Sequence, residues 1–394
     1  MSSRTVFKNY FANYDQILFA VAVLLTIVGV YLQFNIATSL GNSFQMSLFL
    51  NQLKSLVVAT LVFIAFIRIK KLEEFLFKYS YVFVGLIITM LVFVLLYGIT
   101  TQGSTRWIRI AFISFQPSQL AHPILIIFYA KYFQKKKDII KSTGFFKFLG
   151  NFQGLIFITL LVVVLIYLER HLSTLIVLCL TLLAMLYVAE FKKRLIFMLI
   201  FLTLALLYLG INFSHNYRSG RMDIYAEYSL FHKALGIEKE NVSADSYQIR
   251  ESLKAISQGG LVGTGREGGR AKHLFLPDVN SDYIFAMIGE ELGFIGGLII
   301  IILFSIFLFR SVSIGVSAES FFSELVAIGM GINIFVTAMV NIGVSLSALP
   351  STGLTLPFIS YGGSALVVNA AMLAIILNIS KERLHTSRNQ SMRG

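Results

Sequence analysis

The sequence has little cysteine, proline or charge, and these shortages exclude several kinds of protein. Its 394 residues include one cysteine, Cys179, so an internal disulfide framework is impossible. The six histidines are scattered, without HExxH or C-x-x-C spacing, so no metal site built by the protein is predicted. Charged residues make up 13% of the chain, and nothing soluble remains that could form a separate catalytic domain.

Apolar residues dominate instead. They make up 56% of the chain, and the mean hydropathy is +0.77. A soluble chain of this length cannot bury that much apolar surface, so the composition predicts a polytopic membrane protein. The 36 phenylalanines and 17 tyrosines suit lipid-facing and interfacial positions. No cleavable signal peptide is expected, because the first apolar run is long enough to span and lacks an A-x-A-like site.

A membrane span needs about 20 apolar residues, and this length predicts an all-α bundle of about ten transmembrane helices. The predicted spans lie near 15–34, 50–69, 77–99, 117–133, 153–169, 172–189, 194–213, 282–309, 321–347 and 356–380. We treat 1–394 as a single membrane domain. One large extracytoplasmic loop, 214–281, separates the seventh helix from the eighth, and a basic cytoplasmic tail occupies 381–394.

The distribution of lysine and arginine predicts the orientation. With the N-terminus inside, cytoplasmic segments hold 20 of the 33 cations, and the short outer segments hold four. Both termini are therefore predicted to be cytoplasmic. The basic stretch 131–147 and the tail are interpreted as anchors for lipids of the inner leaflet. This accounts for most of the net charge of +13 and argues against nucleic acid as a partner.

The long outer loop contains two recognisable stretches. Residues 244–260 have apolar side chains at helical spacing, which predicts an amphipathic helix on the membrane surface. GTGREG, at 263–268, matches the G-x-G-x-x-G string of dinucleotide sites, but no βαβ pattern surrounds it, so that interpretation is rejected. A flexible turn and a backbone nest for phosphate oxygens both remain open.

Carboxylates cluster where this loop enters the eighth span. Asp278 and Asp282 follow a group of cations, Arg266, Arg270 and Lys272. A solvated loop of mixed charge is one interpretation; the other is a cationic patch for an anionic head group beside a proton acceptor. Asp282 directly precedes the apolar run, where the helix dipole and partial desolvation suit a general base.

Glu290 and Glu291 lie two to three turns deeper in the same span. Ionisable groups at that depth normally face the bundle interior, so we predict a structural polar network for this pair. The stretch 341–367 contains Pro350, Pro357 and several glycines. Such residues at membrane depth indicate a re-entrant or cavity-lining element. In GSTRWIRI, 103–110, the single tryptophan lies between two arginines, a pattern typical of an interfacial anchor.

Three motifs in these stretches resemble the SEDS family of bacterial peptidoglycan polymerases, typified by FtsW and RodA. GSTRWIRIAFISFQPSQLA resembles the family's G-x-x-R-W…QPSE stretch, and LFLPDVNSDYIFAMIGEELGF resembles its YLPE-x-HTDFIFA-x-IGEELGF block. LPSTGLTLPFISYGGSALV resembles its LPTKGLPLPFISYGGSSL block. The resemblance covers nearly the whole chain. The amino acids within the motifs are closer to those of FtsW, the division member of the family, than to those of RodA.

The resemblance implies an inverting glycosyltransferase that polymerises lipid II at the outer face of the cytoplasmic membrane, at the division septum, and releases undecaprenyl pyrophosphate. Asp282 takes the position of the presumed catalytic aspartate. Substrate binding is predicted for Arg106, Trp107, Arg109, Gln116, His122, Arg266, Arg270, Lys272, Ser360, Tyr361, Gly362 and Gly363. A structural role is predicted for Glu290, Glu291, Pro350 and Pro357.

The implied partners are lipid II, the nascent glycan strand, a class B penicillin-binding protein transpeptidase, other divisome proteins and membrane lipids. No cofactor is required by the sequence. A divalent cation, Mg²⁺ or Mn²⁺, is chemically suited to assist the pyrophosphate, but no ligand set is evident.

Departures from the family pattern are concentrated in two places. Gln119 and His122 replace a Glu and a Lys, and Arg170 and His171 stand in a stretch that usually reads PD-x-GT. These changes weaken any mechanism that needs that Glu or that Lys. Three alternatives stay open: a lipid II flippase or other lipid transporter, an elongation polymerase of the RodA type, and a divisome scaffold. Ten spans with broken helices suit transport as well.

Overall fold

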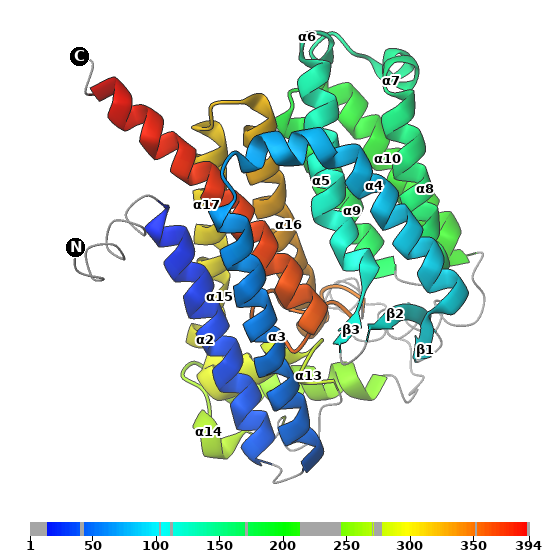
Figure 1. Ribbon diagram of the computed structural model, residues 1–394. Coiled ribbons are helices and arrows are strands. Elements are labelled where there is room, and N and C mark those ends of the chain that lie inside the picture. The colour runs from blue at the N-terminus through cyan, green and yellow to red at the C-terminus, as the bar shows by residue number, and fades with distance from the viewer. Residues whose placement is uncertain are drawn as a thin grey trace.

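The computed structural model describes residues 14–39, 43–101, 104–110, 113–169, 172–212, 246–269, 271, 278–350 and 353–391. Arg170, Arg270, Lys272 and most of the large loop, residues 213–245, lie outside the described residues. Within the described part the chain folds as a bundle of long helices (Figure 1).

The long helices follow the predicted apolar runs. They are α2 (Gln16–Ser39), α3 (Ser43–Arg68), α4 (Leu72–Tyr97), α5 (Pro117–Lys135), α8 (Gln153–Leu168), α9 (Leu172–Val188), α10 (Lys193–Asn212), α15 (Ile284–Val316), α16 (Phe321–Ser345) and α17 (Gly363–Ser391). By length and composition, six described helices can cross a membrane, or seven with the bent pair α7–α8. The chain is thus a polytopic helical membrane protein, and ten spans stay a prediction.

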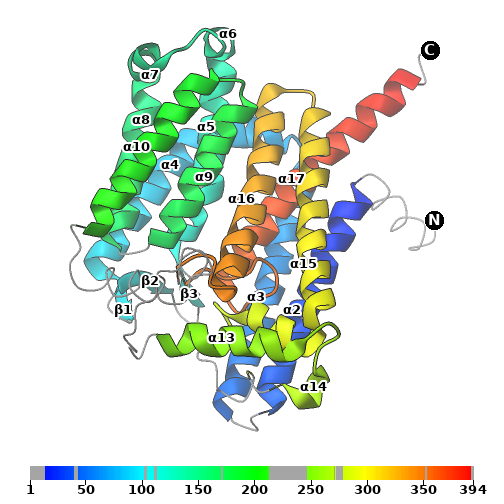
Figure 2. The same ribbon diagram turned by 180° about the vertical axis from the view of Figure 1, so that it is seen from behind.

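The shorter elements gather at the two ends of the bundle (Figures 1 and 2). At one end lie α6 (Lys137–Ile140) and α7 (Phe145–Asn151), with the turns that precede α4, α10 and α16. At the other end lie α13 (Ser246–Gly259), α14 (Gly265–Gly268) and a three-stranded sheet. We call these the basic end and the loop end. The basic stretch 131–147 lies at the basic end, as the predicted orientation requires.

The sheet is an addition to the predicted all-α architecture. Strands β1 (Ile99–Thr101), β2 (Ser104–Ile110) and β3 (Ile113–Phe115) form an antiparallel meander in the order β1-β2-β3. Ile99 pairs with Trp107 and Arg109 pairs with Ser114. The alternation of STRWIRI and its β-branched and aromatic residues favour a strand, although the tryptophan between two arginines also fits the interfacial anchor predicted above. The meander joins α4 to α5 at the loop end.

The core lies around α16 and α17, whose apolar windows are 72% and 78% buried, against 17% for α3. Helix α16 packs on α15, α5 and α9, and α17 packs on α3. Figure 1 shows α17 passing between α3 and α16 and extending beyond the bundle at the basic end. The N-terminal half of α5 is almost wholly buried, so its polar side chains face protein.

Helix α13 confirms the predicted helix at 244–260 but not its predicted surroundings. It lies across the loop end of the bundle (Figure 2). Its buried residues Ile249, Ser252 and Ala255 pack against α15 and α16, and the Ser252 hydroxyl donates to the carbonyl of Ser345 at 2.8 Å. The apolar face therefore covers protein, where lipid was expected, because the start of α15 offers it a complementary surface.

The stretch 341–367 is interrupted as its prolines and glycines predict. Helix α16 ends at Ser345, and α17 begins at Gly363, seven residues after the predicted start of the last span. Described residues 353–362 between them have no helix, and Phe358 has a left-handed backbone with φ of 65°. This segment returns to the loop end, where it meets the turn that holds Asp282.

Candidate active site

Asp282 lies in a tight turn that leads directly into α15. Its backbone N–H and that of Ser281 donate to the carbonyl of Asp278 at 3.0 and 3.1 Å. Asp278 has a left-handed backbone with φ of 54°, which closes the turn. The side chain of Asp282 is half-buried. This places a carboxylate at the N-terminus of a helix, where the helix dipole stabilises negative charge.

The backbone of the turn is held from α2 and α3 by amide side chains. Gln33 donates through Nε2 to the carbonyl of Asn280 at 2.8 Å. Asn280 in turn donates through Nδ2 to Oε1 of Gln45 at 2.9 Å. Both glutamines are buried. The first two helices thereby fix the position of the residues just before Asp282.

Segment 353–363 also holds this turn. Ser360 donates its hydroxyl to the carbonyl of Ser281 at 2.6 Å and accepts from the backbone N–H of Leu356 at 2.8 Å. The backbone N–H of Tyr361 donates to the carbonyl of Asn280 at 2.8 Å. Two of the residues predicted for substrate binding thus position the Asp282 turn through their hydroxyl and backbone groups.

Gln52 and Ser364 anchor this segment to the rest of the bundle. Gln52 donates through Nε2 to the carbonyl of Ser360 at 3.2 Å, and its Oε1 accepts from the backbone N–H of Gly362 at 3.3 Å. The Ser364 hydroxyl accepts from the backbone N–H of Gln116 at 3.0 Å. Gln116 is therefore tied to the start of α17. Gly363 lies against Ser55, whose Oγ would be 2.7 Å from a Cβ placed there.

Asn341 connects the Asp282 turn to segment 353–363. This fully buried residue of α16 donates through Nδ2 to the carbonyl of Asp282 at 3.0 Å and to that of Leu354 at 2.6 Å. Gly353 lies against the carboxylate, because a Cβ built there would be 3.4 Å from Oδ2 of Asp282. The backbone of Gly353 has φ of 68°, which favours glycine. One side of the Asp282 carboxylate is thus bordered by the main chain of Gly353.

His122 lines a small cavity together with Gln119, Leu354 and Thr355. Asn333 donates through Nδ2 to Oγ1 of Thr181 at 3.1 Å and lies 2.8 Å from Nδ1 of His122. An amide nitrogen only donates, so Nδ1 is the acceptor and the imidazole proton is on Nε2. The buried imidazole is therefore a neutral hydrogen-bonding group in this structure.

The β meander carries the predicted Arg106 and Trp107, both half-buried on β2. Arg106 attracts Glu169, a fully buried carboxylate at the end of α8, and Ser118 of α5 lies beside the same carboxylate. Sequence reasoning did not select Glu169, although an acid at the end of an apolar span is a signal in itself. Arg109 lies on β2, and its side chain is outside the described part.

Glu290 ties the segment after α14 to α15, and Glu291 ties α15 to α2. Both are buried; Oε2 of Glu290 accepts from the backbone N–H of Ala271 at 2.9 Å, and Oε2 of Glu291 accepts from Nδ2 of Asn35 at 3.2 Å. Helix α15 is broken at Gly293, with φ of 67° and ψ of −168°. A Cβ on Gly293 would lie 2.3 Å from the backbone nitrogen of Gly263.

The break exposes backbone groups, and the 259–264 loop satisfies them. The N–H groups of Phe294 and Ile295 donate to the carbonyls of Gly260 and Leu261 at 2.9 and 3.1 Å. Thr264 donates its N–H to the carbonyl of Glu290 at 2.9 Å. Gly263 and Thr264, at the start of GTGREG, therefore pack closely against the backbone of α15.

Of the three cations predicted in the loop before Asp282, Arg266 is among the described residues. Arg266 lies on α14, is exposed, and donates to Oγ1 of Thr38 on α2 at 3.2 Å. Arg270 and Lys272 lie outside the described residues. Pro350 follows α16 and Pro357 is buried in segment 353–363. No described group of three His, Cys, Asp or Glu side chains could hold a metal ion.

The comparisons identify the family. A family model described as cell cycle protein, which groups FtsW, RodA and SpoVE, matches residues 15–385. This chain belongs to that family. FtsW of Wigglesworthia glossinidia brevipalpis, a probable peptidoglycan glycosyltransferase, is 31% identical over 381 residues, 95% of either chain. Stage V sporulation protein E of Bacillus subtilis is 33% identical over 72% of this chain and 73% of its own.

Solved structures of the FtsW/RodA/SpoVE family share the fold. A chain from a peptidoglycan synthase complex, described for its coordination of polymerization and crosslinking, has a TM-score of 0.74 and 22% identity, covering 94% of this chain and 98% of its own. RodA of Thermus thermophilus has a TM-score of 0.65 and 21% identity, covering 94% and 97%. The chain therefore has the same overall fold as these solved structures.

Residues that sequence reasoning missed are amides within apolar spans. Gln33, Gln45, Gln52 and Asn341 all lie within helices of high apolar content, and each forms a hydrogen bond around the Asp282 turn. A polar side chain at membrane depth is costly unless paired, so each was a usable signal. Their partners are main-chain groups far away in sequence, which composition cannot reveal.

Proposed function

We propose that this chain is a peptidoglycan glycosyltransferase that polymerises lipid II. The observation that carries the proposal is Asp282, a half-buried carboxylate at the start of α15, positioned at its backbone by α2, α16 and segment 353–363. A general base needs this combination of a fixed position and a helix N-terminus that favours its charged form. The names of the family's relatives support the same activity.

In the proposed reaction, Asp282 accepts the proton of the 4-hydroxyl of the acceptor GlcNAc. The hydroxyl oxygen forms a bond to the anomeric carbon of the donor MurNAc, and the bond from that carbon to the pyrophosphate oxygen breaks with inversion. The products are a β-1,4-linked strand and undecaprenyl pyrophosphate. The fixed turn contributes orientation, because misplacing a reacting group by about 1 Å can cost about 100-fold in rate.

The departing pyrophosphate carries negative charge that cationic side chains would stabilise. Arg266 and Arg106 are the proposed groups among those described, with Arg109, Arg270 and Lys272 as further candidates from the sequence. His122 is neutral in its present hydrogen-bonding state, so we propose that it contributes a hydrogen bond in place of a charge. The described residues offer no ligand set for a divalent cation, and the proposed step does not use one.

The proposed setting follows the charge distribution. We propose that the loop end, with Asp282, faces outward, that the basic end faces the cytoplasm, and that both termini are cytoplasmic. We propose the cytoplasmic membrane at the division septum, because an FtsW protein matches this chain over 95% of both sequences and the motifs resemble those of FtsW. The proposed partner is a class B penicillin-binding protein, and one solved relative belongs to a synthase complex that couples polymerization to crosslinking. Other divisome proteins are proposed on the same grounds.

The test is polymerisation of lipid II by the purified chain reconstituted with its transpeptidase. Asp282→Asn keeps the shape of the side chain but removes the base, so glycan strands are expected to disappear. Asp278→Asn is the matched control, because asparagine tolerates the left-handed backbone and this carboxylate is exposed. Polymer from Asp282→Asn at the native rate would overturn the base assignment.

The same preparation discriminates between the polymerase and the transporter. Lipid II translocation across liposomes is measured beside strand formation. A protein that moves lipid II without making strands, and whose transport is unchanged in Asp282→Asn, would replace the polymerase with the flippase. A scaffold would show neither activity with any partner and would still restore division with Asp282→Asn.

A further inference from the structure

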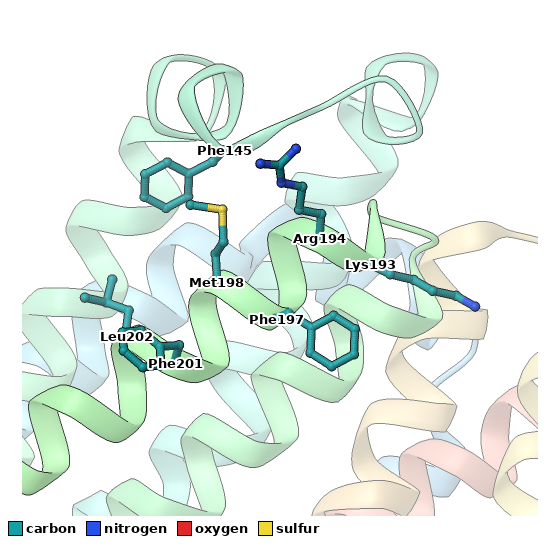
Figure 3. A pocket seen from close by; sticks show the side chains of 7 residues that line it. All are labelled: Phe145, Lys193, Arg194, Phe197, Met198, Phe201 and Leu202. Carbon is teal, nitrogen blue, oxygen red and sulfur yellow. The ribbon is translucent and has the colours of Figure 1, made fainter.

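A groove on the outer surface of α10 (Figure 3) lies beside α7 at the basic end, opposite the loop end of the bundle (Figure 1). It has a volume of about 650 Å³ and is lined by Phe145 of α7 and by Lys193, Arg194, Phe197, Met198, Phe201 and Leu202 of α10. None of these residues takes part in the site described above. We propose that this groove binds one anionic phospholipid of the leaflet at the basic end.

The sequence of α10 builds the groove from two parallel rows of side chains. Residues 193, 197 and 201 form one row at spacings of four, and 194, 198 and 202 form the next. Rows of this kind are the ridges of an α-helix, and the depression between them runs nearly along its axis. Each row begins with a cation and continues with apolar side chains. The groove is therefore charged at one end and apolar along its length.

The apolar length matches one leaflet. Eight residues of helix separate Lys193 from Phe201, a rise of about 12 Å. Half of a hydrocarbon core of about 30 Å is slightly longer than this. An acyl chain lying between the rows would thus reach from the interface most of the way to the bilayer centre.

Helix α7 places the cationic end at the membrane interface. It is bent by 85° from α8, so it lies across the direction of the spans. Phe148 on one side of α7 is buried, whereas Phe146 is exposed. Phe145 extends from the start of α7 toward Met198, and the guanidinium of Arg194 lies beside it (Figure 3). An interfacial helix thus closes the groove where a lipid head group would sit.

Charge complementarity decides in favour of an anionic lipid. Lys193 and Arg194 are exposed, and within the described residues neither forms an ion pair. The nearest acid along the chain, Glu190, is paired with Lys141 at 2.5 Å. Two cations are thus available to a phosphate group. A partner's transmembrane helix would fill the apolar rows but would leave these cations without counter-charge.

The exposure of the apolar row shows that it is not needed for the packing of α10. Phe197 and Phe201 are 70% and 75% exposed, whereas Leu195 and Ile196 on the other face are buried. Helix α10 packs mainly on α9 and lies at the edge of the bundle (Figure 2). Changing the groove should therefore leave the fold intact.

The test is native mass spectrometry of the full chain in detergent, titrated with dioleoyl phosphatidylglycerol or dioleoyl phosphatidylcholine. One phosphatidylglycerol is expected to bind preferentially. Lys193→Gln with Arg194→Gln should weaken that binding by about 30-fold, the effect of two interfacial cations. The matched control is Lys70→Gln with Lys192→Gln, which removes the same charge from exposed positions at the same end and should change binding less than twofold.

A third variant tests the apolar rows. Phe197→Ser with Phe201→Ser should weaken the binding of both lipids while the unfolding temperature without lipid stays unchanged. Equal losses in the two charge variants would mean diffuse attraction and overturn the site. Unchanged phosphatidylglycerol binding in the serine variant would overturn it as well, and a native dimer that this variant abolishes would assign the groove to a second copy.

Discussion

Amides and hydroxyls hold the main chain of the Asp282 turn at the loop end, whereas the basic end adds ion pairs to amide contacts of this kind. At the loop end, neutral amides and hydroxyls bind main-chain carbonyls, as Gln33, Asn341 and Ser360 do around residues 280–282. At the basic end, charged groups pair: Arg310 with Asp15 across α15 and α2, and Lys141 with Glu190. Tyrosine and phenylalanine rings also lie under lysines there, as for Lys131 over Tyr81.

The role proposed for Asp282 gives this difference a chemical reason. A base that accepts a proton must keep its charge available, and a strong structural ion pair would lower its basicity. The contacts that position the Asp282 turn are made with carbonyl oxygens of residues 280–282, so the turn is fixed through its main chain. In the proposed mechanism no carboxylate at the basic end has to accept a proton, so ion pairs there can stabilise the fold.

The largest effect is expected from Gly293→Ala at the break in α15. The backbone there, with φ of 67° and ψ of −168°, is accessible essentially to glycine alone, and the new Cβ would meet the nitrogen of Gly263. We expect a loss of about 3 kcal/mol or more in unfolding free energy. Chemical denaturation measures it. Gly85→Ala, in open space within α4, is the control and should be neutral or slightly stabilising.

The second largest effect is expected at Asn341. Together with Asn378 at the basic end, this residue tests the difference between the two ends, because each of these amides binds more than one carbonyl. Asn341→Leu removes the hydrogen bonds to Asp282 and Leu354, leaving buried carbonyls unsatisfied. Each such group costs about 1–3 kcal/mol, and the shifted turn should lower polymerisation by about 100-fold.

Asn378→Leu is its counterpart at the basic end. Asn378 donates to the carbonyls of Phe66, Ile67 and Ile69, so its loss should cost similar stability. Polymerisation per folded molecule should nevertheless stay near native, since this amide is remote from the Asp282 turn. Equal activity losses in the two leucine variants would mean that the loop end has no special role.

How much of the fold could be predicted from the sequence depends on how far apart the interacting residues lie along the chain. Apolar run length predicted where the helices lie, and the proline and glycine content of 341–367 predicted its interruption. The β meander was missed because seven residues of alternating pattern, 104–110, also suit an interfacial anchor. The helix at 246–259 was predicted, but its α15 partner was not, because an apolar face does not specify what it covers.

For the candidate site too, the sequence predicts local features but not long-range contacts. Asp282 was accessible to sequence reasoning because a carboxylate at the start of an apolar run is rare and the surrounding motif resembles a known block. The amides that hold it were not, since Gln33 and Asn341 are 247 and 59 residues from their carbonyl partners. Tertiary hydrogen bonds of this range leave only the weak signal of a polar residue within a span.

A smaller effect is expected from Asp15→Asn at the basic end. Asp15 pairs with Arg310 and also accepts from the backbone N–H of Leu18 at 2.9 Å, as a cap of α2. Asparagine preserves the cap but removes the charge. We expect a loss of about 1–2 kcal/mol in unfolding free energy, with unchanged polymerisation per folded molecule. A large activity loss at constant stability would contradict the division of roles between the two ends.

The smallest effect on the unfolding midpoint is expected at the start of α4, where the contacts of the neighbouring acids Glu73 and Glu74 can be compared. Lys71 and Glu74 form an exposed pair at 2.8 Å, in which solvent screens most of the attraction, so Lys71→Gln should leave the unfolding midpoint unchanged. Glu73 accepts from the hydroxyls of Ser320 and Ser323 and so ties α4 to α16. Glu73→Gln should lower the midpoint measurably. Ion pairing in itself would then contribute little at the basic end, and charge would matter there only where it joins two helices.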